Sequence, residues 1–301
     1  MIDERIDIIP QASDFRSVAR ALTIVENDMS GANELLKDLK FSKNAPVIGI
    51  TGPPGSGKST LANALIGRLA AEGLKIAVLA IDPTSPFNYG SLLGDRIRMA
   101  AHFNHPNIFI RSLATRGSLG GLSAKTIEMS DVLRSAGFDY IIIETVGVGQ
   151  TEIEIAGLAD ITLVVLVPES GDEIQNIKSG IMEIADAFIV NKADKAGADL
   201  FANNLQKITS QKKESKVPVF KTIASRPEGV HELVDFILAS SHFPNTRKEL
   251  LLTEKAYKII QQKRMTDVNK NELKIVLSEA LTKPGFNLYD FAEKYFDQPK
   301  Y

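Results

Sequence analysis

The stretch Gly52-Pro53-Pro54-Gly55-Ser56-Gly57-Lys58-Ser59-Thr60 matches the pattern G-x-x-x-x-G-K-[ST], which is typical of the phosphate-binding loop of P-loop NTPases. An apolar run at 47–51 precedes it, and leucines at helical spacing follow it. Phosphate binding needs this strand–loop–helix layout, because glycines let backbone N–H groups turn toward the oxygens and the helix N-terminus adds partial positive charge. A chance glycine-rich turn would lack these flanks. The stretch therefore predicts a site for a nucleoside triphosphate.

Each residue type in this loop has an expected task. We expect Lys58 to reach the β- and γ-phosphates and the Ser59 hydroxyl to bind Mg²⁺. Backbone groups of the remaining loop residues should surround the phosphate oxygens. The predicted phosphate-binding residues are Gly52, Pro54, Gly55, Ser56, Gly57, Lys58, Ser59 and Thr60.

Composition excludes several classes of function. The 301 residues are 44% hydrophobic and 24% charged, which is ordinary for a globular chain with one large α/β domain and appendages. A net charge of -2 argues against nucleic-acid binding, and without cysteine the chain can form no disulfide or thiolate metal site. The sequence begins without a signal-like apolar run, and nothing approaches the about 18 apolar residues of a membrane span. We expect a soluble cytoplasmic protein without a membrane partner.

Two further apolar runs end in a carboxylate. The run 75–82 ends at Asp82, and the run 139–144 ends at Glu144, with Gly147 three residues later. Continuous apolar character favours central parallel strands, whose carboxyl ends face the ligand in open α/β sheets. Glu144 is thus predicted as the Walker B acid, although a plain strand-end charge is the alternative. We expect Gly147 to sense the γ-phosphate through its N–H and Asp82 to support Mg²⁺.

Spacing leaves other charged residues open. Asp95 could be a metal-site residue, a helix cap or a surface charge. Lys178 is expected on the solvent side of a helix unless the fold returns it to the nucleotide. Arg96 and Arg116 could neutralise transition-state charge or lie on the surface. No residue must be the catalytic base, so Lys58 and Glu144 are the catalytic residues that we predict.

The base-reading segment follows a later strand. The run 187–190 leads into Asn191-Lys192-Ala193-Asp194, which fits N-K-x-D, the guanine reader of GTPases. The Asp194 carboxylate can accept both the ring N–H and the exocyclic amino group of guanine. Adenine lacks this donor pair and would leave a buried carboxylate unpaired. The predicted nucleotides are therefore GTP and GDP, with Asn191, Lys192 and Asp194 at the base and Ala224 adding a backbone contact.

Strand and helix patterns alternate along the middle of the chain, which predicts an α/β P-loop NTPase fold with a mostly parallel sheet flanked by helices. We predict an N-terminal helical extension at 1–45, a GTP-binding domain at 46–240 and a C-terminal helical arm at 241–301. Ser30-Gly31 should separate two helices of the extension, which we interpret as a packing element. The arm could pack on the core, but its short aromatic-bearing helices favour a dimerisation surface.

Several segments together resemble the methylmalonyl-CoA mutase-associated GTPases (MeaB type), a group of metallochaperone-like P-loop GTPases, over nearly the whole chain. The segments that carry the resemblance are GPPGSGKST at 52–60, IDPTSP at 81–86, LGDRIRM at 93–99, RSLATRGSLGG at 111–121, ETVGVGQ at 144–150 and QNIKSGIMEIAD at 175–186. Residues 87–90 and Ser118 depart from the family pattern, so the first switch can differ and Ser118 receives no role.

The resemblance implies a GTPase that chaperones an adenosylcobalamin-dependent acyl-CoA mutase. Such proteins gate cofactor loading, protect the mutase and hydrolyse GTP slowly to GDP and phosphate until the partner stimulates them. A homodimer built partly through the C-terminal helices is also implied. The resemblance places Lys178 in a third switch and surrounds Mg²⁺ with Ser59, Asp82, Asp95 and Glu144.

Three other functions are alternatives for a chain with this phosphate loop. A metal-insertion GTPase would need cysteine or clustered histidine ligands, and the four histidines form no convincing site. A kinase of a transport system conflicts with the guanine reader. A module that only binds GTP would show no turnover even with a mutase present.

Overall fold

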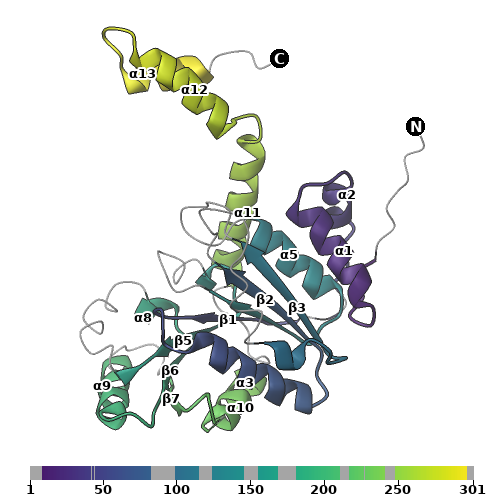
Figure 1. The fold of residues 1–301 in the computed structure, drawn as a ribbon, viewed down its shortest axis with the longest axis vertical. Coiled ribbons are helices and arrows are strands. Elements are labelled where there is room, and N and C mark those ends of the chain that lie inside the picture. The colour runs from purple at the N-terminus through teal and green to yellow at the C-terminus, as the bar shows by residue number, and fades with distance from the viewer. Residues whose placement is uncertain are drawn as a thin grey trace. The chain divides into compact units, whose positions relative to one another are not determined.

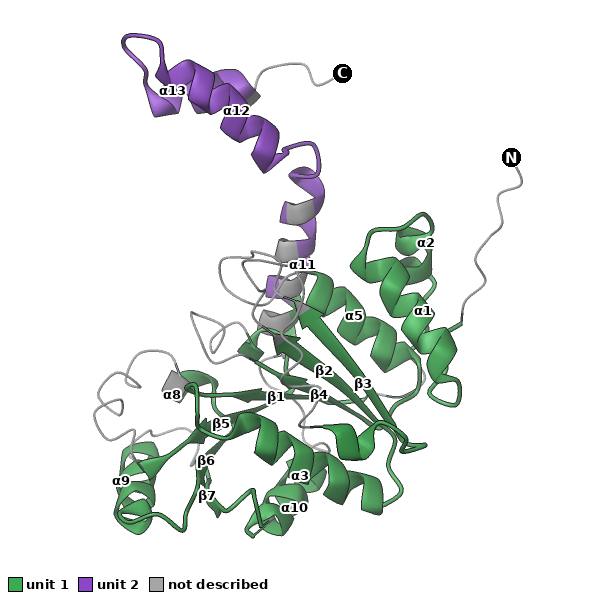
Figure 2. Cartoon of the chain, viewed as in Figure 1, with its two compact units in different colours: residues 1–252 green, residues 253–301 purple. Residues whose placement is uncertain are grey.

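The computed structural model describes residues 9–41, 43, 45–82, 99–114, 124–145, 155–168, 181–210, 217–226, 228–240 and 248–296. The chain divides into two compact units, residues 1–252 and 253–301 (Figure 2). The predicted N-terminal extension, the whole of the predicted GTP-binding domain and the first residues of the predicted arm are therefore parts of one unit.

A seven-stranded sheet forms the centre of the first unit, in the order β3-β2-β4-β1-β5-β6-β7 (Figure 1). All described strand pairings are parallel, which confirms the predicted fold class. Every residue of β1, β4, β5 and β6 is buried, as expected of parallel strands that are covered on both faces. The strands are β1 (Val47–Thr51), β2 (Ile76–Asp82), β3 (Ile108–Ala114), β4 (Tyr140–Glu144), β5 (Ile161–Leu166), β6 (Ala187–Asn191) and β7 (Val219–Thr222).

Strand order places the ligand edge of the sheet. β1 lies between β4 and β5, with β2 and β3 on one side and β6 and β7 on the other. The order of strands therefore reverses at β1, and ligands of open α/β sheets bind at such a switch point. In register, Ile50 of β1 pairs with Glu144, the last residue of β4. The β1–α3 loop and the predicted Walker B acid thus start from adjacent strands.

Helices cover the two faces of the sheet because successive strand side chains alternate. α3 (Lys58–Ala71) and α10 (Val230–Ser240) share one hydrophobic cluster with Leu163 and Val165 of β5. α9 (Ala198–Ser210) packs on the intervening residues Val164 and Leu166. α5 (Ala124–Ser135) packs against β4. The first unit also contains two short elements, η1 (Ala100–His102) and α8 (Ile181–Ile184).

The N-terminal extension forms two helices, α1 (Phe15–Glu26) and α2 (Ala32–Lys37), separated near Ser30-Gly31 as predicted. The apolar residues Val18, Ala21, Leu22 and Val25 of α1 are buried, and α1 lies beside α5 (Figure 1). In the six-residue α2 only Ala32 is buried. Glu26 accepts a 2.6 Å hydrogen bond from Arg111 of β3, and Asp28 pairs with Lys125 of α5. Packing and ion pairs thus join the extension to the sheet domain.

Aspartates at the amino ends of three strands hold neighbouring strands in register. Asp139 accepts the Lys75 N–H, Asp160 accepts the Val47 N–H and Asp186 accepts the Thr162 N–H, each at 2.8 Å. Each aspartate directly precedes a strand, and each N–H lies at the start of the strand beside it. These backbone N–H donors at the amino ends of the strands therefore have hydrogen-bond partners.

The second unit is helical and has little core of its own. It contains most of α11 (Lys248–Arg264), together with α12 (Lys270–Leu281) and α13 (Leu288–Phe296). Pro284-Gly285 separates α12 from α13, with Gly285 at φ 80°. Among the residues of this unit whose side chains are described, none is fully buried.

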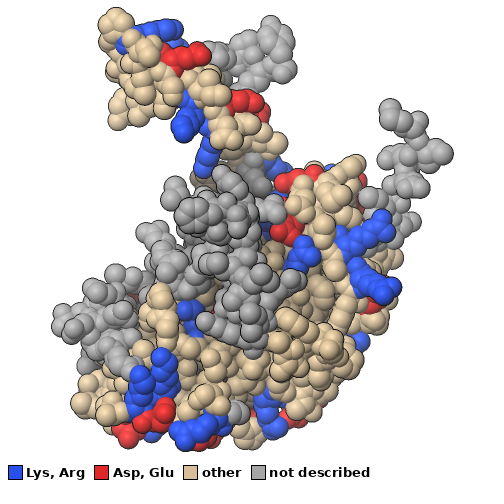
Figure 3. Space-filling model, in the orientation of Figure 1, with Lys and Arg blue, Asp and Glu red and all other residues tan. Residues whose placement is uncertain are grey.

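No helix in the described ranges is long and apolar enough to cross a membrane. On the face shown in Figure 3, lysine and arginine side chains lie beside aspartate and glutamate side chains over the lower part of the first unit. This mixture agrees with the small net charge of -2.

Candidate nucleotide-binding site

The phosphate loop joins β1 to α3 and packs against the ends of β5 and β6. A Cβ atom on Gly52 would lie 2.1 Å from the Val165 carbonyl oxygen, and one on Gly57 would lie 2.3 Å from Nδ2 of Asn191. Both glycines also have positive φ, at 139° and 87°. Only glycine combines this conformation with so close an approach. The glycines of the motif therefore serve the packing of the loop as well as access for phosphate.

Lys58 bridges the loop from inside. Its side chain is buried, and its Nζ donates to the carbonyl oxygens of Gly52 at 2.9 Å and Pro53 at 3.0 Å. The ammonium group is thus held at the centre of the loop, where phosphate oxygens would approach. Its contact with phosphate stays a prediction.

Ser59 and Glu144 meet as predicted. The Ser59 hydroxyl donates a 2.5 Å hydrogen bond to Oε1 of Glu144, and the two residues are only 7% and 4% exposed. Thr145, which follows Glu144, donates its N–H to the Ile50 carbonyl and its hydroxyl to Thr51 at 3.1 Å. The ends of β1 and β4 are therefore tied together beneath the loop.

This pair fits Mg²⁺. Hydroxyl and carboxylate oxygens are the ligands that Mg²⁺ prefers, and the ion commonly takes one or two protein ligands together with substrate phosphates. Because the Ser59 proton points to Glu144, the lone pairs of the hydroxyl oxygen stay available to a cation. Within the described part of the chain, no group of three or more His, Cys, Asp or Glu side chains could hold a metal by itself.

Asn191 connects the base-reading segment to the phosphate loop. Its buried side-chain Nδ2 donates to the Ser56 carbonyl at 2.9 Å, while its Oδ1 accepts from the Thr222 hydroxyl and the Ala224 N–H, both at 3.1 Å. Lys192, at φ 55°, donates from Nζ to the Gly55 carbonyl at 2.8 Å. These two residues therefore join the phosphate loop to the ends of β6 and β7.

Asp194 lies beside the loop that follows β7. The Ala193 N–H donates to the Thr222 carbonyl at 3.0 Å, which sets Asp194 next to this loop, and the Asp194 side chain is 48% exposed. Ala224 lies on this loop, and its backbone N–H donates a hydrogen bond to Oδ1 of Asn191. A direct contact from Ala224 to the base remains a prediction, whereas its contact with Asn191 was not expected from the sequence.

Several predicted residues fall outside the described ranges. Asp95, Gly147 and Lys178 lie there, as do Arg96 and Arg116. For Asp82 the structure gives the strand position at the end of β2 but not the side chain. The structure thus brings together the phosphate loop, Glu144 and the N-K-x-D segment, and leaves the rest of the predicted metal and switch residues as predictions.

Sequence reasoning missed Arg226, which lies close to the Asp194 carboxylate, and the Thr51–Thr145 pair. A basic residue two positions after Ala224 was visible, but nothing local indicated that it would face Asp194. The two threonines each follow an apolar run, and their contact depends on the pairing of β1 with β4.

Comparison with known proteins agrees with this geometry. Residues 18–281 match the model of a family described as methylmalonyl Co-A mutase-associated GTPase MeaB. A protein of Pyrococcus horikoshii that is named as a GTPase is 48% identical over 249 residues, which cover 80% of this chain and 78% of its own. The fused isobutyryl-CoA mutase of Geobacillus kaustophilus is 35% identical over 243 residues, covering 75% of this chain and 22% of that protein.

A solved structure shares the fold. The crystal structure of a LAO/AO transport system kinase has a TM-score of 0.64 and 25% sequence identity, covering 91% of this chain and 84% of its own. The family match spans the phosphate loop, Glu144 and the N-K-x-D segment together.

Proposed function

Because the chain belongs to the family of methylmalonyl-CoA mutase-associated GTPases, we propose that it acts as a GTP-hydrolysing chaperone of an adenosylcobalamin-dependent acyl-CoA mutase. In this role it gates cofactor loading and protects the mutase. GTP hydrolysis itself follows from the family and from relatives named as GTPases. The mutase partner is supported by a relative in which a mutase is fused to a similar segment.

The observation that supports a mutase partner is the relative from Geobacillus kaustophilus. A segment of that fused isobutyryl-CoA mutase aligns with 75% of this chain but makes up only 22% of that protein. In that protein, a GTPase-like segment and a mutase share one polypeptide. A separate GTPase of the same family would then meet its mutase by association.

Catalysis in this proposal is positioning and charge neutralisation. Lys58 exchanges its two carbonyl partners for phosphate oxygens, and a buried ammonium interacts more strongly there than it would in water. Ser59 and Glu144, with Asp82 and Asp95 by prediction, would hold Mg²⁺. When bound, Mg²⁺ neutralises charge on the β- and γ-phosphates.

Slow turnover by the isolated protein is part of the proposal. From the sequence, no residue must act as the catalytic base, and the two arginines considered for transition-state charge, Arg96 and Arg116, lie outside the described ranges. A supplied arginine can accelerate such reactions by roughly 10³ or more. We therefore expect the partner to order or complete the site, with Gly147 sensing the γ-phosphate and Lys178 signalling to the mutase.

The C-terminal arm supports a homodimer as a further part of the proposal. Its helices expose Tyr257, Ile260, Ile275, Leu281 and Tyr289, which are 51–85% exposed. The described part of this unit buries no side chain completely, so these apolar surfaces are available for association. A second copy of the arm offers the same apolar surface in return.

The deciding experiment measures GTP hydrolysis by the full chain, alone and with methylmalonyl-CoA mutase or isobutyryl-CoA mutase. Stimulation of about tenfold or more by one of them, modest beside the effect of a supplied arginine, supports the chaperone function and identifies the partner. E144Q serves as the control for turnover at this site. Tight GTP binding without stimulation by either mutase would contradict the proposed partner and leave the GTPase in place.

The solved kinase structure raises a second candidate, phosphoryl transfer to an acceptor of a transport system. The Asp194 carboxylate and the family match favour guanine nucleotides and hydrolysis instead. Metal insertion is disfavoured by the donor set, because the chain has no cysteine.

A further inference from the structure

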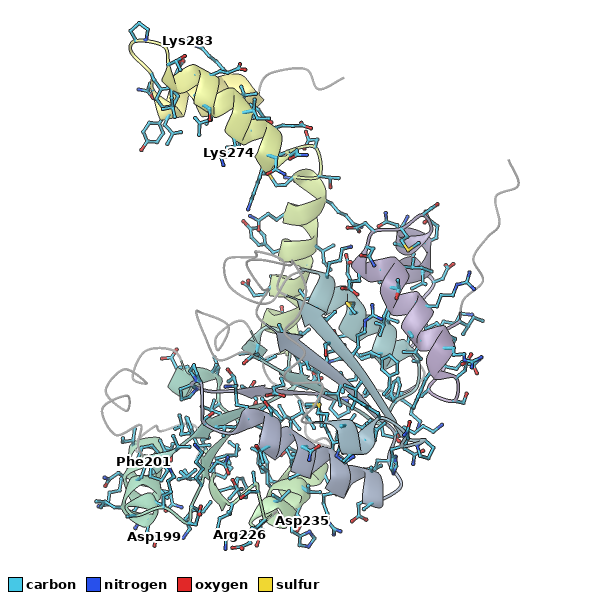
Figure 4. The ribbon with its side chains drawn as sticks, viewed as in Figure 1. Asp199, Phe201, Arg226, Asp235, Lys274 and Lys283 are labelled. Atoms are coloured by element: carbon cyan, nitrogen blue, oxygen red, sulfur yellow. The ribbon has the colours of Figure 1, made fainter. Side chains whose placement is uncertain are left out.

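Arg226 lies between two carboxylates on the loop that follows β7. Its terminal nitrogen is 3.7 Å from Oδ2 of Asp194, and its Nε is 3.5 Å from Oε1 of Glu228. In the view of Figure 4, Arg226 lies between Asp199 of α9 and Asp235 of α10. The Arg226 N–H donates to the Ile223 carbonyl at 2.9 Å, and Ile223 bridges to Glu228, so a tight turn presents the guanidinium.

Asp194 is the carboxylate that we propose as the guanine reader. To accept two N–H donors from the base, its oxygens must turn their lone pairs toward the ring. The Arg226 guanidinium, 3.7 Å from Oδ2, is attracted to the same carboxylate charge and favours an orientation of Asp194 toward itself. Arg226 and guanine therefore compete for one group.

We propose that Arg226 is a residue that tunes nucleotide affinity: it holds Asp194 when no base is bound and weakens guanine binding, while Glu228 draws Arg226 away. This inference rests on the proposed role of Asp194. It assigns opposite effects to two adjacent charges of the same turn. Removal of Arg226 strengthens binding, and removal of the Glu228 charge weakens it.

The size of the effect follows from the exposure of the pair. Both side chains are about half exposed, at 58% for Arg226 and 48% for Asp194. Solvent-exposed ion pairs of this kind correspond to roughly two- to fivefold in an equilibrium constant. Salt should reduce the effect, because exposed charges are screened.

The test measures the Kd of GDP and GTP for the full chain by titration with a fluorescent nucleotide and by competition with the unlabelled form. R226Q is expected to lower the Kd about two- to fivefold and E228Q to raise it, and the R226Q/E228Q double variant should match R226Q. In about 0.5 M salt the difference between wild type and R226Q should shrink. K221Q is the matched control, since it removes a neighbouring cation that pairs with Asp199 instead.

Two outcomes would overturn the inference. A higher Kd for R226Q would make Arg226 a direct contact of the nucleotide, and equal values for all variants would remove it from the site. D194N is measured first to separate the two proposals. If D194N keeps its preference for GTP over xanthosine triphosphate, the reader role of Asp194 itself fails, whatever Arg226 does.

Discussion

At the scale of single residues, Asn191 has the largest structural role in the site. The sequence predicts it as part of the guanine reader. It is 2% exposed, and its side chain makes three hydrogen bonds that join the phosphate loop, β6 and the loop after β7. Lys192 adds a fourth link, to Gly55. The N-K pair thus holds the phosphate loop and the base-reading loop in one arrangement.

Replacement of Asn191 by alanine should therefore destabilise the domain. The Ser56 carbonyl, the Thr222 hydroxyl and the Ala224 N–H would lose their partner in a buried position, at a cost of about 2–4 kcal/mol in the free energy of unfolding. Urea denaturation followed by circular dichroism measures this loss. The control is N204A, which removes an exposed asparagine of α9. Equal stability of N191A and N204A would refute the structural role.

At the scale of elements, parallel strands and the residues at their two ends have separate tasks. The carboxyl ends supply Glu144 and Asn191 to the site, while the amino ends carry Asp139, Asp160 and Asp186. Each of these aspartates accepts a backbone N–H of the adjacent strand. The amino ends therefore contribute to register and stability, away from the chemistry.

Asp139 gives this arrangement a dependence on pH. Burial alone would raise the pKa of its carboxyl, but the Lys75 N–H and the Lys43 ammonium outweigh burial and hold the pKa below its ordinary value of 3.8. Below that value, the unfolded chain binds a proton that the folded chain resists. The stabilisation from Asp139 is therefore present above pH 3.8 and is lost as pH falls through the lower folded pKa.

Thermal unfolding between pH 3 and 7 tests this expectation. D139N should be less stable than the wild type at pH 7, because the charge that attracts Lys43 is gone. The difference between the two proteins should narrow as pH falls below about 4, where the Asp139 carboxyl of the unfolded wild-type chain takes up its proton before that of the folded chain. A difference that stays constant over the whole range would mean that the charge of Asp139 makes no contribution.

At the scale of the whole molecule, the two units differ in what they bury. The first has an extensive core, whereas the described part of the second exposes large apolar side chains, including Ile275 and Leu281 of α12. An isolated unit of this kind gains little from the hydrophobic effect. We propose that a second chain covers this surface.

The expected result is a dimer of the wild type and a monomer of the I275D/L281D variant. Charged side chains on this face cannot be desolvated without large cost, so association should be lost while the sheet domain stays folded. Sedimentation velocity at several concentrations gives the oligomeric state, and GDP binding reports the intact first unit. E279Q, on the same helix, is the control for a change on α12. A dimeric I275D/L281D variant would place the interface elsewhere.

The sequence alone predicted the chemistry of the site. The phosphate loop, the acid at the end of β4 and the guanine reader are short contiguous motifs, and their letters carry the binding groups directly. Continuous apolar runs likewise predicted the buried parallel strands, because a strand covered on both faces needs apolar residues at successive positions. Glu144 and Ser59 were expected in one site and meet there.

Only the tertiary structure decided which of these residues touch. Asn191 reaches Ser56 across 135 residues of sequence, and Arg226 faces Asp194 from a different loop. Such contacts follow from strand order, β1 between β4 and β5 and β6 beside β7, which local periodicity does not encode. Burial is decided in the same way, because it depends on the neighbour that a helix meets: in α2 only Ala32 is buried.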